Sequence, residues 1–255
     1  MTPPINKNLA EICGIHLGDG CISITKRYKE YALCGDIIEE RRYYDEFIIP
    51  VFNKEISQPT LGKSLKGKSY TKMGVYGLIT FEPKIVEKFL NIGFRAGSKR
   101  NQGIPTKIMG LNKNKKKHFI RGLFDTDGTI YFEKNYSKKT SKNTRPKIKF
   151  STVSKKIAKQ VVEILTEMEF NPMIKKPYKG KRDKNYNYQL VLYRKRDIEK
   201  WLEEIGFRNP KHSTKVQIWK KFGYCPPNTK IKFREKYLVS YLAKLKIGTL
   251  SVESS

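Results

Sequence analysis

A nine-residue segment of this chain returns 108 positions later, so the sequence contains two copies of one unit. The first copy, residues 12–20, reads ICGIHLGDG, and the second, residues 120–128, reads IRGLFDTDG. A second pair of segments repeats in the same order, with IGFR at 92–95 and again at 205–208. Two repeated signals in one order predict an internal duplication and therefore two similarly folded halves.

The two copies predict the same order of elements, αββαββα, from hydrophobic periodicity and turn residues. The first copy predicts a helix ending near Gly20, strands at 21–25 and 31–34, a helix at 39–52, strands at 61–70 and 73–81, and a helix opened by Pro83. The second copy predicts a helix ending before Gly128, strands at 129–133 and 146–152, a helix at 154–169 capped by Ser154, strands at 173–178 and 186–194, and a helix to Ile205. We expect an α+β fold with two pseudo-symmetric repeats, the motif helices packed at the centre and two antiparallel sheets forming a saddle.

The chain divides into four segments. We expect a first repeat at 1–111, a polar linker at 112–117, a second repeat at 118–224 and a tail at 225–255. The tail predicts a terminal helix that packs onto the body, because apolar residues recur there at helical spacing. These residues are Tyr237, Leu238, Tyr241, Leu242 and Leu245.

The charge balance indicates a polyanionic partner. The 53 Lys and Arg residues outnumber the 24 Asp and Glu residues, which gives a formal net charge of +29, and nucleic acid is the leading candidate. No apolar run approaches the ~20 residues that a bilayer span needs, and residues 1–11 lack a hydrophobic signal region. We expect an intracellular protein, cytoplasmic or organellar, with no membrane partner. The four cysteines show no paired spacing, which argues against structural zinc.

The repeated segments predict two helices that pack closely on each other. Gly14 and Gly18 lie four residues apart on one helix face, as do Gly122 and Thr126. Small residues at this spacing let two backbones approach. Such a pair would deliver two carboxylates, those of Asp19 and Asp127, to the same end. The simpler interpretation is that two Asp-Gly turns merely end two helices.

Two carboxylates at that place call for a cation. They repel by ~3 kcal/mol at about 5 Å and an effective dielectric constant of 20, and each opposes the dipole of its own helix. Divalent cations would reverse this balance. Oxygen ligands with positions left open for water and phosphate suit Mg²⁺, and paired metal ions can stabilise the attacking and leaving oxygens of phosphodiester cleavage.

The two segments resemble the LAGLIDADG, or dodecapeptide, family of homing endonucleases in its single-chain, two-repeat form. The second copy keeps more of the family pattern than the first copy, in which His16 and Leu17 replace the usual apolar and acidic pair. The positions that follow the pattern are Gly14, Asp19 and Gly20 in the first copy and Gly122, Leu123, Asp125, Asp127 and Gly128 in the second.

The resemblance implies a set of site residues. Asp19 and Asp127 would bind two or more Mg²⁺ or Mn²⁺ ions, with the carbonyl groups of Gly18 and Thr126 as additional ligands. A water molecule would attack the scissile phosphate, one strand at each site. Family members also place a basic residue after the last helix of each half, and we assign this role to Lys99 and Lys211, as electrostatic support for the developing charge. The alternative is that either lysine is a solvated surface residue.

The strands after each motif alternate in the same phase. Ile22 and Ile24, like Ile130 and Phe132, would face the helices, which turns the polar set outward. A β-ribbon fits the major groove of DNA, where such side chains can reach base edges. We predict DNA contacts from Ser23, Thr25, Arg27, Tyr131, Glu133, Asn135, Lys147, Lys149 and Ser151. The basic segments around Lys68 and Lys175 are predicted to contact phosphates.

The leading hypothesis is a site-specific, divalent-metal-dependent endonuclease that acts as a monomer on double-stranded DNA. It would cleave a long asymmetric site and promote homing of the intron or gene that encodes it. One alternative is an RNA maturase that assists splicing, with intron RNA as its partner. Another is a non-cleaving, sequence-specific DNA-binding regulator. An intein setting is disfavoured, because splice-junction residues are not seen at the chain's ends. A GIY-YIG nuclease is disfavoured because GVYG at 74–77 lacks its partner motif, and an HNH nuclease because the three histidines form no metal pair.

Overall fold

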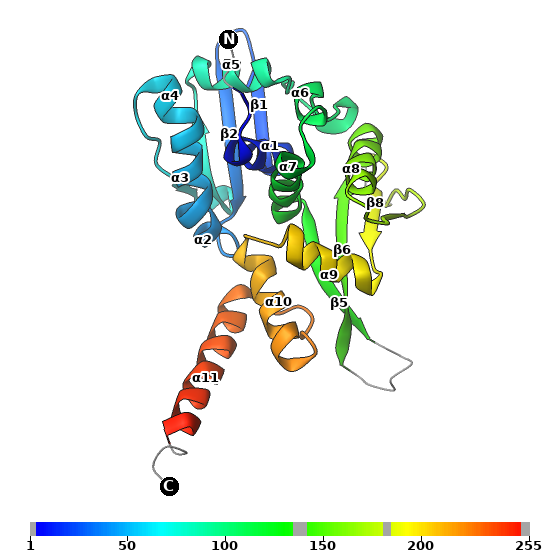
Figure 1. Cartoon of the computed structure of the whole chain (residues 1–255). Helices are drawn as coiled ribbons and strands as arrows, with labels where there is room; N and C mark the ends of the chain where they lie inside the picture. The colour runs from blue at the N-terminus through cyan, green and yellow to red at the C-terminus, as the bar shows by residue number, and fades with distance from the viewer. Residues whose placement is uncertain (1–3, 135–141, 181–184, 251–255) are drawn as a thin grey trace.

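The computed structural model describes residues 4–134, 142–180 and 185–250, with side chains described up to residue 240. It contains two four-stranded antiparallel sheets, with strand orders β1-β2-β4-β3 and β5-β6-β8-β7. The identical orders confirm the predicted duplication and the α+β class. Figure 1 shows the helices α1 and α7 side by side at the centre of the molecule, with one sheet on either side.

The first half follows the predicted order of elements. Its helices and strands are α1 (Lys7–Asp19), β1 (Gly20–Ile24), β2 (Lys29–Asp36), α2 (Arg41–Tyr43), α3 (Ile49–Phe52), α4 (Gln58–Leu61), β3 (Lys68–Tyr70), β4 (Val75–Thr80), α5 (Pro83–Ile92) and α6 (Thr106–Met109). Short 3₁₀ turns occupy Thr71–Met73 and Lys99–Asn101. The strands predicted at 61–70 and 73–81 are therefore shorter than expected.

The helix expected at 39–52, which already includes Pro50, is longer than predicted and continues through Pro59 to Leu61. The segments α2, α3 and α4 form one helical run that includes π-helical turns at Tyr44–Ile48 and Asn53–Ser57. Pro50 and Pro59 lie just after these turns. Proline has no N–H for the usual helical hydrogen bond, and a wider turn accommodates its ring without ending the helix.

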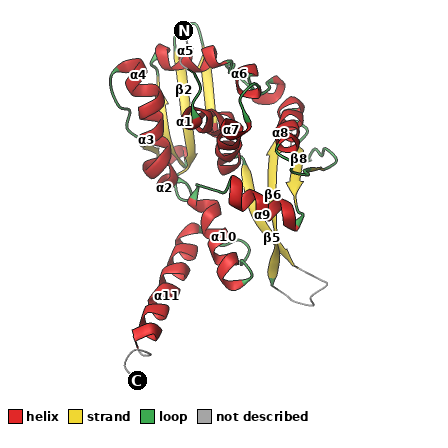
Figure 2. Cartoon of the chain, viewed as in Figure 1, coloured by secondary structure: helices red, strands yellow, loops and turns green. Residues whose placement is uncertain are grey.

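The second half repeats the arrangement. Its elements are α7 (Lys113–Thr126), β5 (Gly128–Lys134), β6 (Asn143–Thr152), α8 (Lys155–Glu167), β7 (Met173–Ile174), β8 (Tyr188–Leu192), α9 (Lys195–Glu204), α10 (Pro210–Phe222) and α11 (Ile231–Leu250). Figure 2 shows α8 and α9 lying across the second sheet, with which both are in contact. The apolar faces of these helices and of the sheet form the core of this half.

The residues expected to form a linker belong to a helix instead. Asn112 caps α7 by accepting a hydrogen bond from the Lys115 N–H at 3.0 Å, so residues 113–117 form the first turns of the second motif helix. Lysine has a good helix propensity, and the Lys116 ammonium is held by Glu167 at 2.6 Å. Residues 112–117 predict a linker because all of them are polar, and this composition makes the N-cap residue Asn112 hard to recognise.

The predicted strand phases are correct except at one position. Ile22, Ile130, Phe132, Ile148 and Phe150 are buried against the helices. Ile24, expected to face inward, is instead 45% exposed, because β1 ends there and the chain enters the turn to β2.

The predicted terminal helix is present as α11. Tyr237 and Leu238 pack against the core, and the Arg234 side chain is buried at the base of the helix. Figure 1 shows that the rest of α11 extends away from the body. The side chains of Tyr241, Leu242 and Leu245 fall outside the described part. Within the described residues, no helix combines the length and apolar character needed to cross a membrane.

Candidate active site and nucleic-acid interface

The two motif helices end side by side. A Cβ atom placed on Gly18 would lie 2.0 Å from Thr126 Oγ1, which shows how closely the last turns approach. The Thr126 hydroxyl donates back to the carbonyl groups of Gly122 and Leu123, both at 3.0 Å. The Thr126 hydroxyl therefore makes its hydrogen bonds within the last turn of α7. Asp19, the last residue of α1, and Asp127, the C-cap of α7, consequently emerge at the same end of the pair.

The two carboxylates share one electrostatic environment. Asp19 is half-buried and accepts a hydrogen bond from Tyr44 Oη at 3.1 Å. Burial raises the pKa of Asp19 well above its ordinary value, and the negative charges of Glu40 and Asp127 raise it further. Asp127 reaches solvent, although the surrounding protein still raises its pKa and Glu40 adds to this effect. Both groups therefore lie where added positive charge would be stabilising.

The structure places Lys99 beside the Gly18 end of this helix pair. It lies in the 3₁₀ turn Lys99–Asn101, and its ammonium donates a hydrogen bond to the Gly18 carbonyl. Burial lowers the pKa of Lys99, whereas the charges of Asp127 and Asp19 act in the opposite direction. Lys99 thus faces both aspartates and is not a solvated surface lysine.

Lys211 is also placed near the site, but with a different partner. It lies in the first turn of α10, and its Nζ is 3.4 Å from Glu40 Oε1. Its charge lowers the pKa of Asp127, while burial and Glu40 raise that pKa. The positive charge of Lys99 therefore lowers the pKa of both aspartates, whereas the charge of Lys211 lowers that of Asp127.

The donor set fits a hard divalent cation that keeps water ligands. Among the described residues, no three His, Cys, Asp or Glu side chains come together as a closed metal cage. Asp19 and Asp127 offer two carboxylates whose pKa values are raised first by burial and further by the negative charge of Glu40. Two protein carboxylates with water and phosphate completing the shell is an arrangement that Mg²⁺ accepts. The Gly18 carbonyl, predicted as a ligand, is hydrogen-bonded to Lys99 here, and no contact of the Thr126 carbonyl identifies it as one.

A buried charge cluster crosses the helix pair next to the site. Glu11 of α1 accepts from Arg121 Nε at 2.8 Å and from Arg208 Nε at 3.0 Å, and it contacts His118 Nδ1 at 3.2 Å. Asp125 is fully buried and accepts from Tyr43 Oη at 3.2 Å. Every one of these contacts to Glu11 and Asp125 joins one repeat to the other. The cluster therefore locks the relative position of the two motif helices.

Sequence reasoning missed Glu40 and Asn209. Glu40 lies just before α2 and is buried, yet its charge raises the pKa of both Asp19 and Asp127. Asn209 caps α10 and donates to Glu40 Oε1 at 3.0 Å across 169 residues of sequence. The helical capping pattern could have indicated Asn209 as a cap, but nothing local in the sequence indicates that these two residues meet.

The predicted DNA-reading residues lie on the outward faces of the strands, with two qualifications. Thr25 and Arg27 lie in the exposed turn after β1, where Thr25 Oγ1 accepts from the Arg27 and Tyr28 N–H groups at 3.2 and 3.1 Å. The Thr25 hydroxyl therefore also shapes the turn. Asn135 lies outside the described residues. The remaining predicted residues are partly exposed, namely Ser23, Tyr131, Glu133, Lys147, Lys149 and Ser151.

Side chains of the second sheet contact each other across strands. Lys147 Nζ is 2.6 Å from Glu133 Oε2, and Lys149 Nζ lies 5.9 Å from the centre of the Tyr131 ring. These pairs hold the long lysine side chains over the sheet. The outward surface of this half thus combines cations, a carboxylate and an aromatic ring, which suits hydrogen bonding to base edges.

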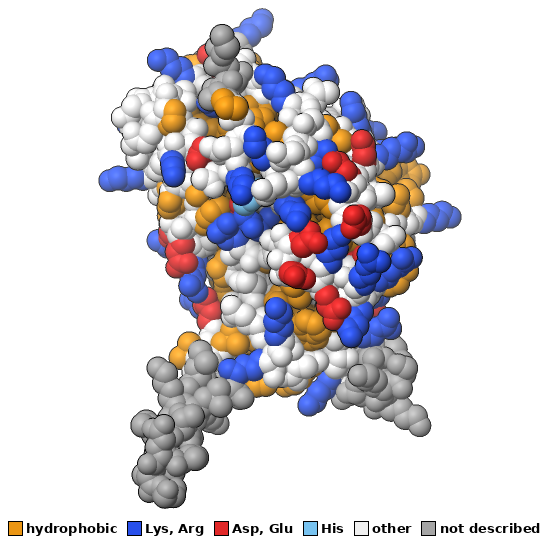
Figure 3. All heavy atoms as spheres, viewed as in Figure 1, with side chains coloured by type: hydrophobic (Ala, Val, Ile, Leu, Met, Phe, Trp, Pro, Cys, Tyr) orange, Lys and Arg blue, Asp and Glu red, His pale blue; other side chains and the backbone are white. Residues whose placement is uncertain are grey.

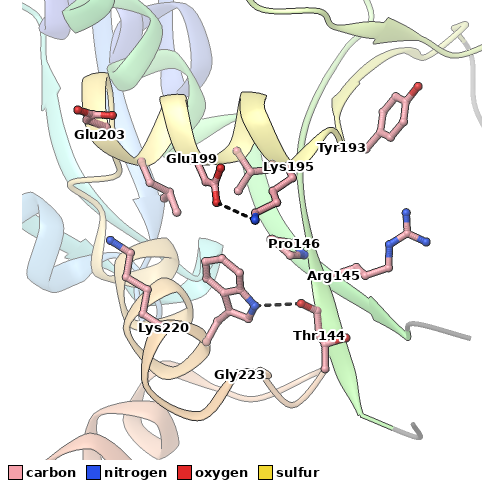
Figure 4. A pocket seen from close by; sticks show the side chains of 12 residues that line it. Thr144, Arg145, Pro146, Tyr193, Lys195, Glu199, Glu203, Lys220 and Gly223 are labelled. Carbon is pink, nitrogen blue, oxygen red and sulfur yellow. Dashed lines mark hydrogen bonds and ion pairs between the residues drawn. The ribbon is translucent and has the colours of Figure 1, made fainter. Parts of the chain in front are cut away.

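The molecular surface carries its charge in a mixed pattern. Figure 3 shows Lys and Arg side chains over both halves of one face, with Asp and Glu side chains among them. A cavity of about 1040 Å³ lies between β6, α9 and α10, lined among others by Thr144, Lys195 and Trp219 (Figure 4). Neither Asp19 nor Asp127 lines this cavity, so the candidate site is the open end of the helix pair.

Comparison with known proteins confirms the resemblance noted in the sequence. Residues 114–206 match the family of LAGLIDADG-like domains. An uncharacterised protein of Methanocaldococcus jannaschii is 28% identical over 188 residues, which cover 69% of this chain and 18% of that protein. A DNA polymerase of Thermococcus hydrothermalis is 26% identical over 224 residues, or 84% of this chain and 12% of the polymerase. This chain thus spans less than a fifth of the length of either relative.

Solved structures share the fold of most of the chain. The homing endonuclease I-DmoI in complex with DNA and Mn superposes with a TM-score of 0.53 at 15% identity, over 77% of this chain and 94% of that one. The LAGLIDADG homing endonuclease I-LtrWI, bound to its target DNA, gives a TM-score of 0.55 at 12% identity, over 86% and 90% of the two chains. Both halves of this protein are therefore arranged as in LAGLIDADG meganucleases.

Proposed function

We propose that this chain, which has a LAGLIDADG-like domain and the fold of the LAGLIDADG homing endonucleases, is itself a site-specific DNA endonuclease. It acts as a monomer on a long asymmetric duplex site, depends on divalent metal, and cuts both strands to promote homing of the intron or gene that encodes it. One observation carries this proposal. Asp19 and Asp127, from two different repeats, emerge at the same end of one helix pair with Lys99 and Lys211 beside them.

The chemistry follows from the arrangement of these four residues. Asp19 and Asp127 would hold the cations, which when bound supply Lewis-acid stabilisation and an activated water molecule. Lys99 and Lys211 add fixed positive charge where a cleaved phosphodiester develops negative charge. Because the helix pair positions the two aspartates, and the segments after α5 and α9 position the two lysines, before substrate arrives, little reorganisation is needed at the moment of reaction.

Recognition of the duplex would come from the two sheets. Their outward faces differ, with Ser23 on the first sheet and with Tyr131, Lys147 and Lys149 on the second. Unlike faces in one chain favour an asymmetric target over a palindrome, and one chain supplies both active aspartates. The net charge of +29 supports binding to a polyanion, and I-LtrWI is a structural neighbour that was solved on its target DNA.

The test is a selection for cleaved sites from a randomised duplex library in the presence of Mg²⁺. The wild-type protein should enrich one long asymmetric site. Asp19→Asn and Asp127→Asn proteins, run in parallel, should bind that site but no longer produce double-strand breaks. If the wild-type protein cuts nothing yet binds duplex DNA or intron RNA tightly, the regulator or maturase function replaces the nuclease.

A further inference from the structure

Lys99 lies in the short loop after α5, and Lys211 lies at the start of α10, directly after the short loop that follows α9. The first lysine loop is residues 95–102, and the second lysine loop is residues 206–211. The first runs beside β1, where the Gly97 N–H donates to the Ile22 carbonyl at 2.9 Å. The place of each ammonium therefore depends on what holds its loop.

The first lysine loop is held from within by Gln102. Its side-chain amide donates to the carbonyl groups of Arg95, Gly97 and Ser98 at 3.2, 3.1 and 3.1 Å. The other repeat in turn holds Gln102, because Ser154 Oγ donates to the backbone carbonyl of Gln102 at 2.6 Å. Ser154 has no exposed surface, so this hydrogen bond is protected from water.

The second lysine loop is held by Asn209. Its Oδ1 accepts from the Lys211 N–H at 2.9 Å, which starts α10. Its amide donates to Glu40 Oε1 at 3.0 Å and to the Asp125 carbonyl at 2.8 Å. Glu40 belongs to the first repeat, where its Oε2 accepts from the Asp36 N–H at 2.9 Å. Asn209 and Glu40 are both buried.

Ser154 and Glu40 occupy the same place in their own repeats. Glu40 lies between the end of β2 and the start of α2, and Ser154 lies between the end of β6 and the start of α8. Each is the residue immediately before the helix. The same position in each repeat thus reaches across the pseudo-twofold axis and holds the lysine loop of the opposite repeat.

We propose that Glu40 and Ser154 are positioning residues that align Lys211 and Lys99, respectively, each acting from the other repeat. This inference rests on the proposed nuclease function. Ser154 acts only through its hydrogen bond to Gln102, whereas Glu40 acts through Asn209 and directly on the Lys211 ammonium, 3.4 Å away. Because each of these hydrogen-bond networks holds one lysine, its loss should impair cleavage of one strand more than cleavage of the other.

The experiment measures the first-cut rate of each strand separately. The duplex site selected by the wild-type protein is labelled on one strand or the other, and the same site is placed in a supercoiled plasmid. Glu40→Gln and Ser154→Ala should each slow cleavage of one strand on the order of tenfold to a hundredfold and leave the other strand within about threefold. The two variants should affect opposite strands, and nicked circles should accumulate.

Matched controls separate positioning from a general loss of stability. Ser57 is a buried serine whose Oγ donates to the Lys63 carbonyl at 2.6 Å, so Ser57→Ala removes an equivalent donated bond outside either loop, whereas Ser154→Ala also removes the α8 cap bond from the Ile157 N–H. Glu167→Gln makes the same change as Glu40→Gln at the end of α8, where the carboxylate pairs with Lys116 at 2.6 Å. Both controls should leave the ratio of the two strand rates unchanged.

Two further measurements keep the inference testable if Ser154→Ala or Glu40→Gln folds poorly. Gln102→Met and Asn209→Ser remove the side-chain amides that hold the first and second lysine loops. They should reproduce the strand defects of Ser154→Ala and Glu40→Gln, respectively. Asn209→Ser combined with Lys211→Gln should be no worse than Lys211→Gln alone, because a neutral positioning residue acts through its lysine.

Equal slowing of both strands, or strand defects shared by the Ser57 and Glu167 controls, would overturn the inference while the nuclease function stands. Absence of any cleavage by the wild-type protein would overturn the proposed function and this inference with it.

Discussion

Gly14 in the first motif helix lies directly against the carbonyl oxygen of Phe119 in the second. A Cβ atom placed on Gly14 would be 2.0 Å from that oxygen. The contact is reciprocated, since a Cβ on Gly122 would be 2.2 Å from the Glu11 carbonyl oxygen. The two helices therefore pack backbone against backbone at two pseudo-equivalent points. This close approach sets the distance between the repeats and hence between Asp19 and Asp127.

Gly14→Ala and Gly122→Ala should each force the helices apart. We expect a loss of about 2 kcal/mol or more in the free energy of unfolding, because the added methyl group meets rigid backbone. Gly110→Ala is the control, since its Cβ would meet the nearest atom at 3.5 Å. Urea denaturation measures the three variants. Equal stability of Gly14→Ala and Gly110→Ala would contradict this account of the interface.

Glu11 should make stability depend on pH in the acid range. Burial alone would raise the pKa of Glu11, but hydrogen bonds from His118 and Arg121 and the charge of Arg208 lower it from 4.5 to about 2. The folded carboxylate thus stays ionised where the unfolded one takes up a proton. Its contribution, about 3 kcal/mol, is complete above pH 4.5 and is lost as the pH falls toward 2.

The measurement is the unfolding free energy of the wild-type and Glu11→Gln proteins between pH 7 and pH 3. The wild-type protein should be more stable at pH 7, and the difference should shrink as the pH falls below 4.5. A difference that is constant with pH would show that the Glu11 charge does not stabilise the fold.

Lys99→Met should slow cleavage of the selected site on the order of a hundredfold, because fixed positive charge beside both aspartates is lost. DNA affinity should change little, since one contact among many is removed. Lys84→Met is a suitable control, as Lys84 is exposed in the first turn of α5. Single-turnover cleavage rates distinguish the two. Comparable rates for both variants would remove Lys99 from the catalytic group.

Metal should stabilise the protein through the paired carboxylates. Without metal, Asp19→Asn and Asp127→Asn should raise the Tm, because each removes one member of a repelling pair. Added Mg²⁺ should raise the Tm of the wild-type protein by binding the folded state, with a smaller rise in either variant. Thermal melts with EDTA and with Mg²⁺ measure both effects. Identical Mg²⁺ responses in all three proteins would place the cation elsewhere.

The second sheet should read one half of the target. Lys149→Ala removes a cation that lies over the Tyr131 ring, and we expect altered base preference at a few positions of one half-site, with a cost of about 1–3 kcal/mol at the affected base pair. Lys68→Ala, on the exposed edge strand β3, should weaken binding evenly across sequences. Binding selections with the wild-type, Lys149→Ala and Lys68→Ala proteins test this. If Lys149→Ala lowers affinity evenly for all sequences, Lys149 contacts phosphate instead of a base.

Much of the fold was predictable from local patterns. The repeated nonapeptides indicated two helices with small residues on one face, and the alternation of Ile130 and Phe132 indicated which strand face is buried. Local patterns gave wrong helix boundaries at two places. The helix expected to end at Phe52 continues past Pro59, because the π-helical turn Asn53–Ser57 accommodates the ring, and residues 113–117 begin a helix because Asn112 caps it.

The sequence by itself determined that Asp19 and Asp127 end equivalent helices, because a duplication preserves spacing and chemical type in each copy. Only the tertiary structure decided which groups surround these aspartates. Glu40 and Asn209, 169 residues apart, meet because the Gly14 and Gly122 contacts close the helix pair and bring the start of one repeat's helix against the other's lysine loop. Such contacts depend on how two packed units face each other, and a periodicity that is read along one segment carries no information about that geometry.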